Sequence, residues 1–218
     1  MREPHSLRIV VAGQKHFGQK VAETLHALAG IEIAAVAAPA DDRLADFAES
    51  RRIHVITALR AHNMPDEIDL IIAAHSHDFI GERTRLRARF GGVGYHPSLL
   101  PLHRGRDAVR WAIRMRERVT GGTVYRLSNR MDGGEILAQR HVFIRPDDDA
   151  QSLWRRDLAP LGIEMLASVV LRFAEFGYQT GAPQDEELAT WEPSIDRPPA
   201  FRPDLMLLTD QRATGTKK

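Results

Sequence analysis

Near its start the chain reads Leu7-Arg8-Ile9-Val10-Val11-Ala12, a short apolar run rich in β-branched residues that stops at Gly13. This composition predicts a buried β-strand. The segment that follows, up to Gly30, carries apolar residues at helical spacing and predicts a helix. A strand followed by a helix is the unit from which parallel α/β sheets are built.

The same alternation continues through the first half of the chain. Further strands are predicted at 31–36, 53–56, 68–74 and 92–95, and further helices at 43–50 and 79–90. These strands are apolar on both faces, so both faces must be covered. The pattern therefore predicts an α/β fold, a Rossmann-like, mostly parallel twisted sheet with helices on both faces.

The pattern changes after about residue 101. A helix and then two antiparallel strands are predicted at 107–118, 120–127 and 135–144. A long helical tract starts at Ala150, and Pro160 should kink or divide it. We expect one catalytic domain at 1–182 and a proline-rich tail at 183–218, of which 213–218 is expected to be disordered.

Composition excludes several classes of protein. Of the 218 residues 43% are hydrophobic and 27% are charged, which is typical of a soluble globular protein. A net charge of +1 gives no strong field toward nucleic acid or acidic membranes. The absence of cysteine excludes disulfides, a cysteine nucleophile and cysteine-bound metals. With no run of apolar residues long enough to span a bilayer, we expect a cytoplasmic protein without nucleic-acid or membrane partners.

Two segments at predicted strand ends could bind ligands. Gly13-Gln14-Lys15 begins a strand-to-helix turn, which can bind an anion through backbone amides or can simply be a tight turn. His75-Ser76-His77-Asp78 follows the most apolar strand, at the edge where α/β sheets bind ligands. A His-x-His pair can hold a metal, although a polar loop is the commoner interpretation.

Two further segments carry more chemistry. Tyr95 to Gly105 contains His96 and two prolines, which make a rigid extended loop able to fix an imidazole, although His96 could equally cap a turn. Met131-Asp132-Gly133-Gly134-Glu135 is, taken alone, typical of a plain turn.

Taken together, these segments carry a resemblance to a known family. The motifs are His96-Pro97-Ser98-Leu99-Leu100-Pro101, Arg104-Gly105, Thr120-Gly121-Gly122-Thr123 and Asp132-Gly133-Gly134-Glu135-Ile136-Leu137. They resemble the catalytic domain of the 10-formyltetrahydrofolate-dependent formyltransferases. Within that family the match is closest to the N-terminal hydrolase domain of the 10-formyltetrahydrofolate dehydrogenases, and it covers about residues 7–192.

The resemblance implies an enzyme of one-carbon metabolism. It implies 10-formyltetrahydrofolate as co-substrate, no metal, and His96 with Asp132 as the catalytic pair. The formyl group would pass to a small-molecule amine, or to water as formate. The family's transferases usually place an oxyanion-binding asparagine two residues before the histidine, where this chain has Gly94. Losing such a donor typically costs about 3–4 kcal/mol, so transfer and hydrolysis both remain open.

The resemblance also implies positions for the ligands. Folate contacts are expected at Ala73, Ala74, His75, Asp78, Phe79, Asn129, Met131 and Gly133, with Ile72, Leu86 and Val93 as further apolar candidates. Candidates for the acceptor or an anion are Gly13, Gln14, Lys15 and Arg104, whereas Arg106 is equally well interpreted as a solvated arginine and His103 as a surface residue.

Two other classes of function stay open on the sequence. One is a metal-dependent hydrolase built on His75 and His77. The other is a non-catalytic folate- or nucleotide-binding protein, which the missing side chain at Gly94 makes credible.

Overall fold

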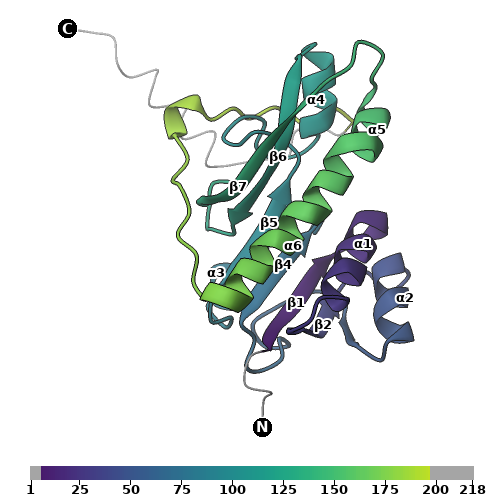
Figure 1. Ribbon diagram of the computed structural model, residues 1–218, viewed down its shortest axis with the longest axis vertical. Coiled ribbons are helices and arrows are strands. Elements are labelled where there is room, and N and C mark those ends of the chain that lie inside the picture. Colours follow the sequence, from purple (N-terminus) through teal and green to yellow (C-terminus); the bar gives the residue numbers. More distant parts are fainter. Residues whose placement is uncertain (1–5, 197–218) are drawn as a thin grey trace, which may run out of the picture.

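The computed structural model describes residues 6–196 and contains a seven-stranded sheet in the order β3-β2-β1-β4-β5-β6-β7 (Figure 1). The strands are β1 (Leu7–Gly13), β2 (Ile31–Ala37), β3 (His54–Ile56), β4 (Leu70–Ala74), β5 (Gly92–His96), β6 (Val119–Arg126) and β7 (Ile136–Phe143). The first five are parallel, and β6 and β7 are antiparallel. This confirms the predicted sheet, including its antiparallel C-terminal strands.

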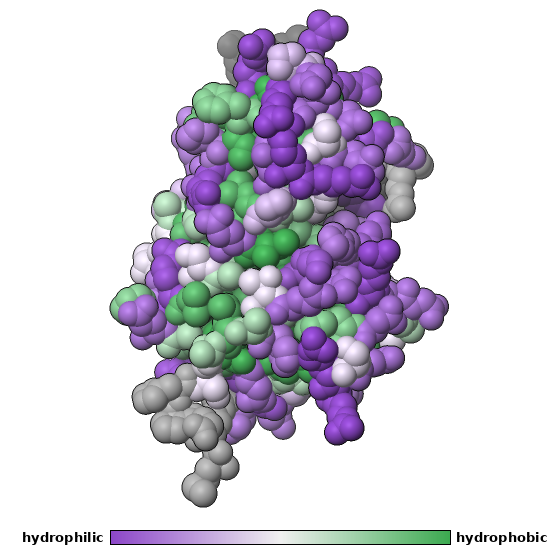
Figure 2. All heavy atoms as spheres, turned by 45° about the vertical axis from the view of Figure 1, so that its right-hand side comes forward, coloured by the Kyte–Doolittle hydropathy of each residue, from purple (hydrophilic) through white to green (hydrophobic). Residues whose placement is uncertain are grey.

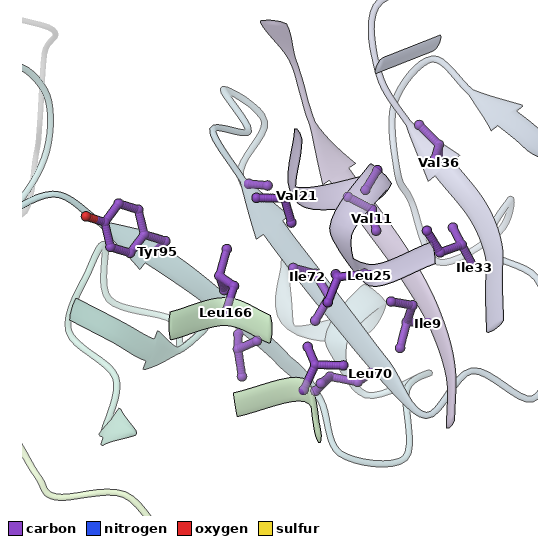
Figure 3. Packing of buried hydrophobic residues seen from close by; sticks show 14 of the residues in the cluster. Ile9, Val11, Val21, Leu25, Ile33, Val36, Leu70, Ile72, Tyr95 and Leu166 are labelled. Atoms are coloured by element: carbon purple, nitrogen blue, oxygen red, sulfur yellow. The ribbon is translucent and has the colours of Figure 1, made fainter. Parts of the chain in front are cut away.

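Three helices cover one face of the sheet: α1 (Lys15–His26), α2 (Arg43–Ser50) and α6 (Ala159–Phe176). Figure 3 shows side chains of β1 and β4 packed against α1 and α6 in this layer. The labelled residues include Ile9, Val11, Val21, Leu25, Leu70, Ile72 and Leu166. Burying this apolar surface is the main force that holds the helices on the sheet.

Pro160 divides the C-terminal helical tract as predicted. A short helix α5 (Ala150–Leu153) continues into a π-helical turn η1 (Trp154–Leu158), and α6 starts directly after it. Pro160 lies in the first turn of α6, where its missing N–H is tolerated. The apolar residues of α6 that were expected to share one stripe are all buried, namely Leu166, Val169, Val170 and Phe173.

The opposite face is covered mainly by irregular segments at 57–69 and 79–91, whose apolar residues form a second cluster. The helix predicted at 79–90 is wrong, because only α3 (Glu82–Arg85) is helical there. The amides of Arg89 and Phe90 donate to the carbonyls of Ile68 and Asp69. Since these amides are used in tertiary pairing, the helix cannot continue through them.

The C-terminal part of the described chain returns across the molecule after α6. It pairs with the start of β7 at Ala182, forms a 3-10 turn η2 (Glu186–Leu188) and runs back toward α4 (Ala108–Arg114) (Figure 1). Residues 213–218, expected to be disordered, lie outside the described residues. Between residues 6 and 196 no helix combines the length and apolarity needed to cross a bilayer. The face shown in Figure 2 is largely hydrophilic, with apolar side chains in small groups.

Candidate active site

A pocket of about 540 Å³ opens where β4 and β5 end. Its walls come from the loops after β4, β5 and β6 and from residues 194 and 196 of the C-terminal segment. Strand order reverses beside it, because β2 lies on one side of β1 and β4 on the other. Open α/β sheets bind ligands at such a switch point, and the volume suits a small molecule.

His96 is the last residue of β5 and faces this pocket. Its ring is buried, and its Nε2 lies 2.7 Å from the carbonyl oxygen of His103. The loop after it is fixed by Thr123 of β6, which donates to the carbonyl of Ser98 and accepts from the amide of Leu100. These bonds and the contact with His103 hold the imidazole in one place, which is the first of the two interpretations that the sequence left open.

Asp132 lies in the loop after β6 and also lines the pocket. One carboxylate oxygen accepts from the hydroxyl of Tyr125 at 2.5 Å, and the other accepts from the amide of Gly105 at 2.7 Å. The second oxygen also lies 3.6 Å from Nδ1 of His96. The structure thus brings the two predicted residues side by side in the pocket lining.

The contacts of His96 define which nitrogen can exchange a proton. A backbone carbonyl can only accept, so the contact with His103 assigns a hydrogen to Nε2. Nδ1 is then the nitrogen that faces Asp132 and the pocket. A distance of 3.6 Å is too long for a direct hydrogen bond but short enough for an ion pair or for proton exchange through a small bridging group.

Gly94 lies on the same side of β5 as His96, opposite Tyr125 in the neighbouring strand. A Cβ atom at Gly94 would lie 3.1 Å from a Leu127 methyl group and 3.4 Å from the Tyr125 ring. Leu127 and Tyr125 therefore leave little room for a side chain at position 94. Transferases of the family that the sequence resembles usually carry asparagine there. The pocket has no side-chain donor at that position.

The residues expected to bind folate divide into two groups. Those that line the pocket are Ala73, His75, Asp78, Phe79 and Met131. Phe79 is 59% exposed, so part of its surface is open to solvent. Ala74 is instead buried under α1, Asn129 accepts a hydrogen bond from Arg85, and Gly133 packs against Arg130.

The further apolar candidates do not reach the pocket. Ile72 and Val93 are fully buried in the core beneath α1 and α6, because side chains alternate between the faces of a strand. Leu86 is 78% exposed, outside the lining of the pocket. These three expectations are corrected.

The turn at Gly13-Gln14-Lys15, where an anion could bind, already has a carboxylate of the protein as its hydrogen-bond partner. The amide of Lys15 donates to both carboxylate oxygens of Asp42, at 2.9 and 2.8 Å. Asp42 also caps α2 through the amide of Leu44. Gly13 is required for packing, since a Cβ there would lie 2.1 Å from the carbonyl oxygen of Ala74. The tight-turn interpretation therefore holds, and the anion-site interpretation is corrected.

Arg104 is not available to an anion either. Its side chain is only 1% exposed, and its guanidinium donates to Gln184 and to both oxygens of Glu186. It also lies over the Trp191 ring, 5.5 Å from the ring centroid. These contacts hold the C-terminal segment against the loop after β5, and they lower the pKa of Glu186 below its usual value. Arg106, by contrast, lines the pocket.

His103, expected at the surface, is buried between two carboxylates. Its Nε2 lies 2.7 Å from Glu117 and its Nδ1 3.1 Å from Glu192. Its amide donates to the hydroxyl of Thr190. His103 thus joins the loop after β5 to the C-terminal segment, and its carbonyl orients the ring of His96.

Removing Arg104 should loosen this C-terminal segment. We expect Arg104→Ala to lower the free energy of unfolding by about 1–3 kcal/mol, because charge-assisted hydrogen bonds are lost while the half-exposed Glu186 can be rehydrated. Urea unfolding measures the change. The control is Arg140→Ala, whose surface pair with Glu164 should contribute less than about 1 kcal/mol. Equal effects in the two variants would contradict this role.

His75 and His77 line the pocket with their ring centroids 5.2 Å apart. Desolvation and then repulsion from His77 lower the pKa of His75 to about 4, so its ring is neutral at pH 7. Among the described residues, no group of three or more His, Cys, Asp or Glu side chains could hold a metal ion. The two histidines therefore lack a third ligand there, and the metal alternative gains no support from this arrangement.

Sequence reasoning missed Tyr125 and the C-terminal segment. Tyr125 donates to Asp132, and Ser194 and Asp196 line the pocket. One signal was available for Tyr125: along a strand it shares a side with Thr123, which lies opposite His96. Nothing in the sequence around Ser194 indicates that it returns to the site.

Comparisons with known proteins agree with this geometry. A family model described as formyl transferase matches residues 32–170. The chain is 30% identical to cytosolic 10-formyltetrahydrofolate dehydrogenase of Mus musculus over 202 residues, which cover 85% of this chain and 22% of that protein. It is 36% identical to methionyl-tRNA formyltransferase of Enterococcus faecalis over 129 residues, 59% of this chain and 41% of that protein.

The chain therefore spans about a fifth of the length of the dehydrogenase. Among solved structures, an N-formyltransferase of Helicobacter canadensis in complex with folinic acid and dTDP-3-aminofucose has a TM-score of 0.71 at 17% identity. That match covers 89% of this chain and 73% of the other, and it shows a common fold. Because the family model covers more than half of the sequence, the protein belongs to the formyl transferase family.

Proposed function

We propose that the protein takes the formyl group of 10-formyltetrahydrofolate and passes it to a small-molecule amine or to water. Membership of the formyl transferase family supports the formyl chemistry, and the name of the related dehydrogenase supports the folate donor. The observation that carries the proposal is the approach of His96 Nδ1 to the Asp132 carboxylate, at 3.6 Å, inside the pocket.

The reaction replaces one bond to the formyl carbon by another. The nucleophile, an amine or water, attacks that carbon, and the carbonyl oxygen becomes negative in the tetrahedral intermediate. The bond from the carbon to N10 of the folate then breaks. One proton lost by the nucleophile ends on N10, so transfer yields tetrahydrofolate and a formylated amine. Hydrolysis yields tetrahydrofolate and formic acid, which releases a second proton to the solvent as formate.

In this proposal His96 stabilises the developing oxyanion. When Nδ1 carries a proton, the ring is positive and Nδ1 is its free donor, since Nε2 is bound to the His103 carbonyl. Preorganised donors of this kind are usually the largest contribution to acyl-transfer catalysis. Holding the ring at both ends avoids reorganisation during the reaction.

Asp132 accepts the proton of the nucleophile and returns it toward the leaving amine. Its two oxygens already accept from Tyr125 and Gly105, and the oxygen bound to Gly105 also faces His96. The carboxylate oxygen that faces Nδ1 is thus positioned to exchange a proton with a nucleophile bound beside the ring.

We place the folate against the rim formed by Ala73, His75, Asp78, Phe79 and Met131, with the Phe79 ring as an apolar contact. Arg106 and Arg130 line the same pocket and are our candidates for anionic groups of the folate or of the acceptor. We further propose that the protein acts in the cytoplasm, without a metal and without nucleic acid. The division into a domain at 1–182 and a tail at 183–218 stays a prediction, although residues 184–196 contribute contacts to the site.

One turnover experiment tests the function. The protein is incubated with 10-formyltetrahydrofolate, with and without a panel of amines, and release of tetrahydrofolate is followed by absorbance. Mass spectrometry then distinguishes formate from formylated amines, and so decides between hydrolysis and transfer. Folate binding without release would favour the non-catalytic alternative. Loss of release after treatment with a chelator would favour the metal-dependent one.

A further inference from the structure

We propose that Tyr125 is a positioning residue, which fixes the Asp132 carboxylate so that one of its oxygens faces His96. This inference rests on the proposed function for its meaning in catalysis. Its structural part stands on the contacts of the described residues alone. The hydroxyl of Tyr125 donates to one oxygen of Asp132 at 2.5 Å, a short distance typical of a hydrogen bond to a charged acceptor.

The Tyr125 ring has little freedom to move. Tyr125 belongs to β6 and pairs with Gly94 of β5. A Cβ atom at Gly94 would already touch the ring at 3.4 Å, so the ring lies over the bare backbone of the glycine. The aromatic ring thereby fills space that a side chain at position 94 would need. Its hydroxyl reaches the Asp132 carboxylate, which lines the pocket.

Tyr125 can act only as a donor in this contact. Burial, together with the adjacent charge of Asp132, raises the pKa of Tyr125 well above its ordinary value of 10. The phenol therefore keeps its proton over the whole working range of an enzyme. Because the amide of Gly105 also donates, each of the two carboxylate oxygens receives a hydrogen bond.

The backbone of Asp132 is held separately from its side chain. Its φ of 51° lies in the left-handed region, which most residues avoid. The Gln184 side chain donates to the carbonyls of Asp132 and Gly134 and thereby ties this turn to the C-terminal segment. Tyr125 thus sets the rotation of the carboxylate, whereas Gln184 holds the peptide.

The other charged groups around Asp132 are placed differently. Among the described residues, His96 of β5 and Tyr125 of β6 are the titratable groups in contact with its carboxylate. Arg104 lies near Gly133 on the other side of the turn, where Glu186 and Gln184 take its hydrogen bonds. Arg106, Arg130, Asp107 and Asp196 line the wider pocket.

Tyr95 provides a matched control for the test. It is also a buried tyrosine, and its hydroxyl donates to the backbone carbonyl of Leu158 at 2.7 Å. Its ring points to the opposite side of the sheet, toward the layer that contains Leu166 (Figure 3). Tyr95→Phe therefore removes a buried hydroxyl of the same kind without touching Asp132.

The experiment compares Tyr125→Phe with Tyr95→Phe in formyl release from 10-formyltetrahydrofolate, as kcat, KM and the pH dependence of kcat. In Tyr125→Phe we expect kcat to fall by about 10- to 100-fold, the size of one hydrogen bond to a charged group, with KM within about twofold. The pH profile should change in Tyr125→Phe, because the Asp132 carboxylate loses the hydroxyl donor that holds it. Tyr95→Phe should lower thermal stability and leave the profile in place.

A second measurement does not depend on turnover. Nitrogen NMR of histidine-labelled protein without substrate reports the protonation of the His96 ring. We expect its signals to change with pH differently in Tyr125→Phe than in wild type, and to be unaffected in Tyr95→Phe. If wild type releases no formyl group, the proposed function fails, but this comparison still decides the role of Tyr125. Unchanged His96 signals and an unchanged kcat in Tyr125→Phe, or equal changes in both variants, would overturn the inference.

Discussion

Replacing His96 by alanine is expected to reduce formyl release by about 10³-fold or more, because the variant loses the oxyanion donor and the group that faces the Asp132 carboxylate. The imidazole is held between the His103 carbonyl and the Asp132 carboxylate, and among the described residues no other donor occupies its position. Release of tetrahydrofolate measures the rate, and circular dichroism checks that the variant is folded.

Two further variants test whether the loss of rate comes from the positive charge of the His96 ring and whether it is particular to this histidine. His96→Gln keeps a donor for the His103 carbonyl but cannot carry a positive charge, so it should be nearly as inactive as alanine while staying more stable. His141 lies exposed on β7, away from the pocket, and His141→Ala should leave the rate within about twofold of wild type. A rate above a tenth of wild type in His96→Ala would refute the assignment.

Asparagine at position 132 should lower the rate by about 10²- to 10³-fold with little loss of stability. The amide is nearly isosteric with the carboxylate, but it cannot accept a proton at neutral pH. Its oxygen can still accept from the Gly105 amide, and the Tyr125 hydroxyl can turn to accept from the new amino group. The loss therefore falls on kcat rather than on folding, as kinetics and thermal unfolding would together show.

The control for this variant is an exposed aspartate that does not line the pocket. Asp41 lies at the surface before α2, and Asp41→Asn should change neither rate nor stability measurably. Wild-type activity in Asp132→Asn would remove the carboxylate from the mechanism. A large loss of stability instead would assign it a structural role.

Helices and strands of the fold were predictable where capping residues and the spacing of apolar residues within the segment determine them. The helix Arg43–Ser50 agrees with its prediction to the residue, because Asp42 caps it and its apolar residues share one face. Pro160 likewise divides its helical tract. The helix predicted around Phe90 is wrong, because the amides there donate to the carbonyls of Ile68 and Asp69. No local sequence pattern reveals this tertiary pairing.

The site was predictable only in part. His96 and Asp132 were found from motifs and not from spacing, since residues on separate loops meet only through the fold. Arg104 was misjudged because Glu186, which neutralises it, lies 82 residues away in the sequence. His103 was misjudged for the same reason, since its burial depends on Glu117 and Glu192.

The carboxylate of Asp42 accepts hydrogen bonds from the amide of Lys15 and so affects which anions can bind at this turn. Where α/β sheets bind nucleotides, the amides at the equivalent turn after β1 receive the phosphate. Here the turn has an internal counter-charge, so a phosphate ester that approached it would be repelled and would have to displace a helix cap. If the proposed acceptor carries a phosphate, Arg106 and Arg130 of the pocket lining are the groups that we propose to bind it.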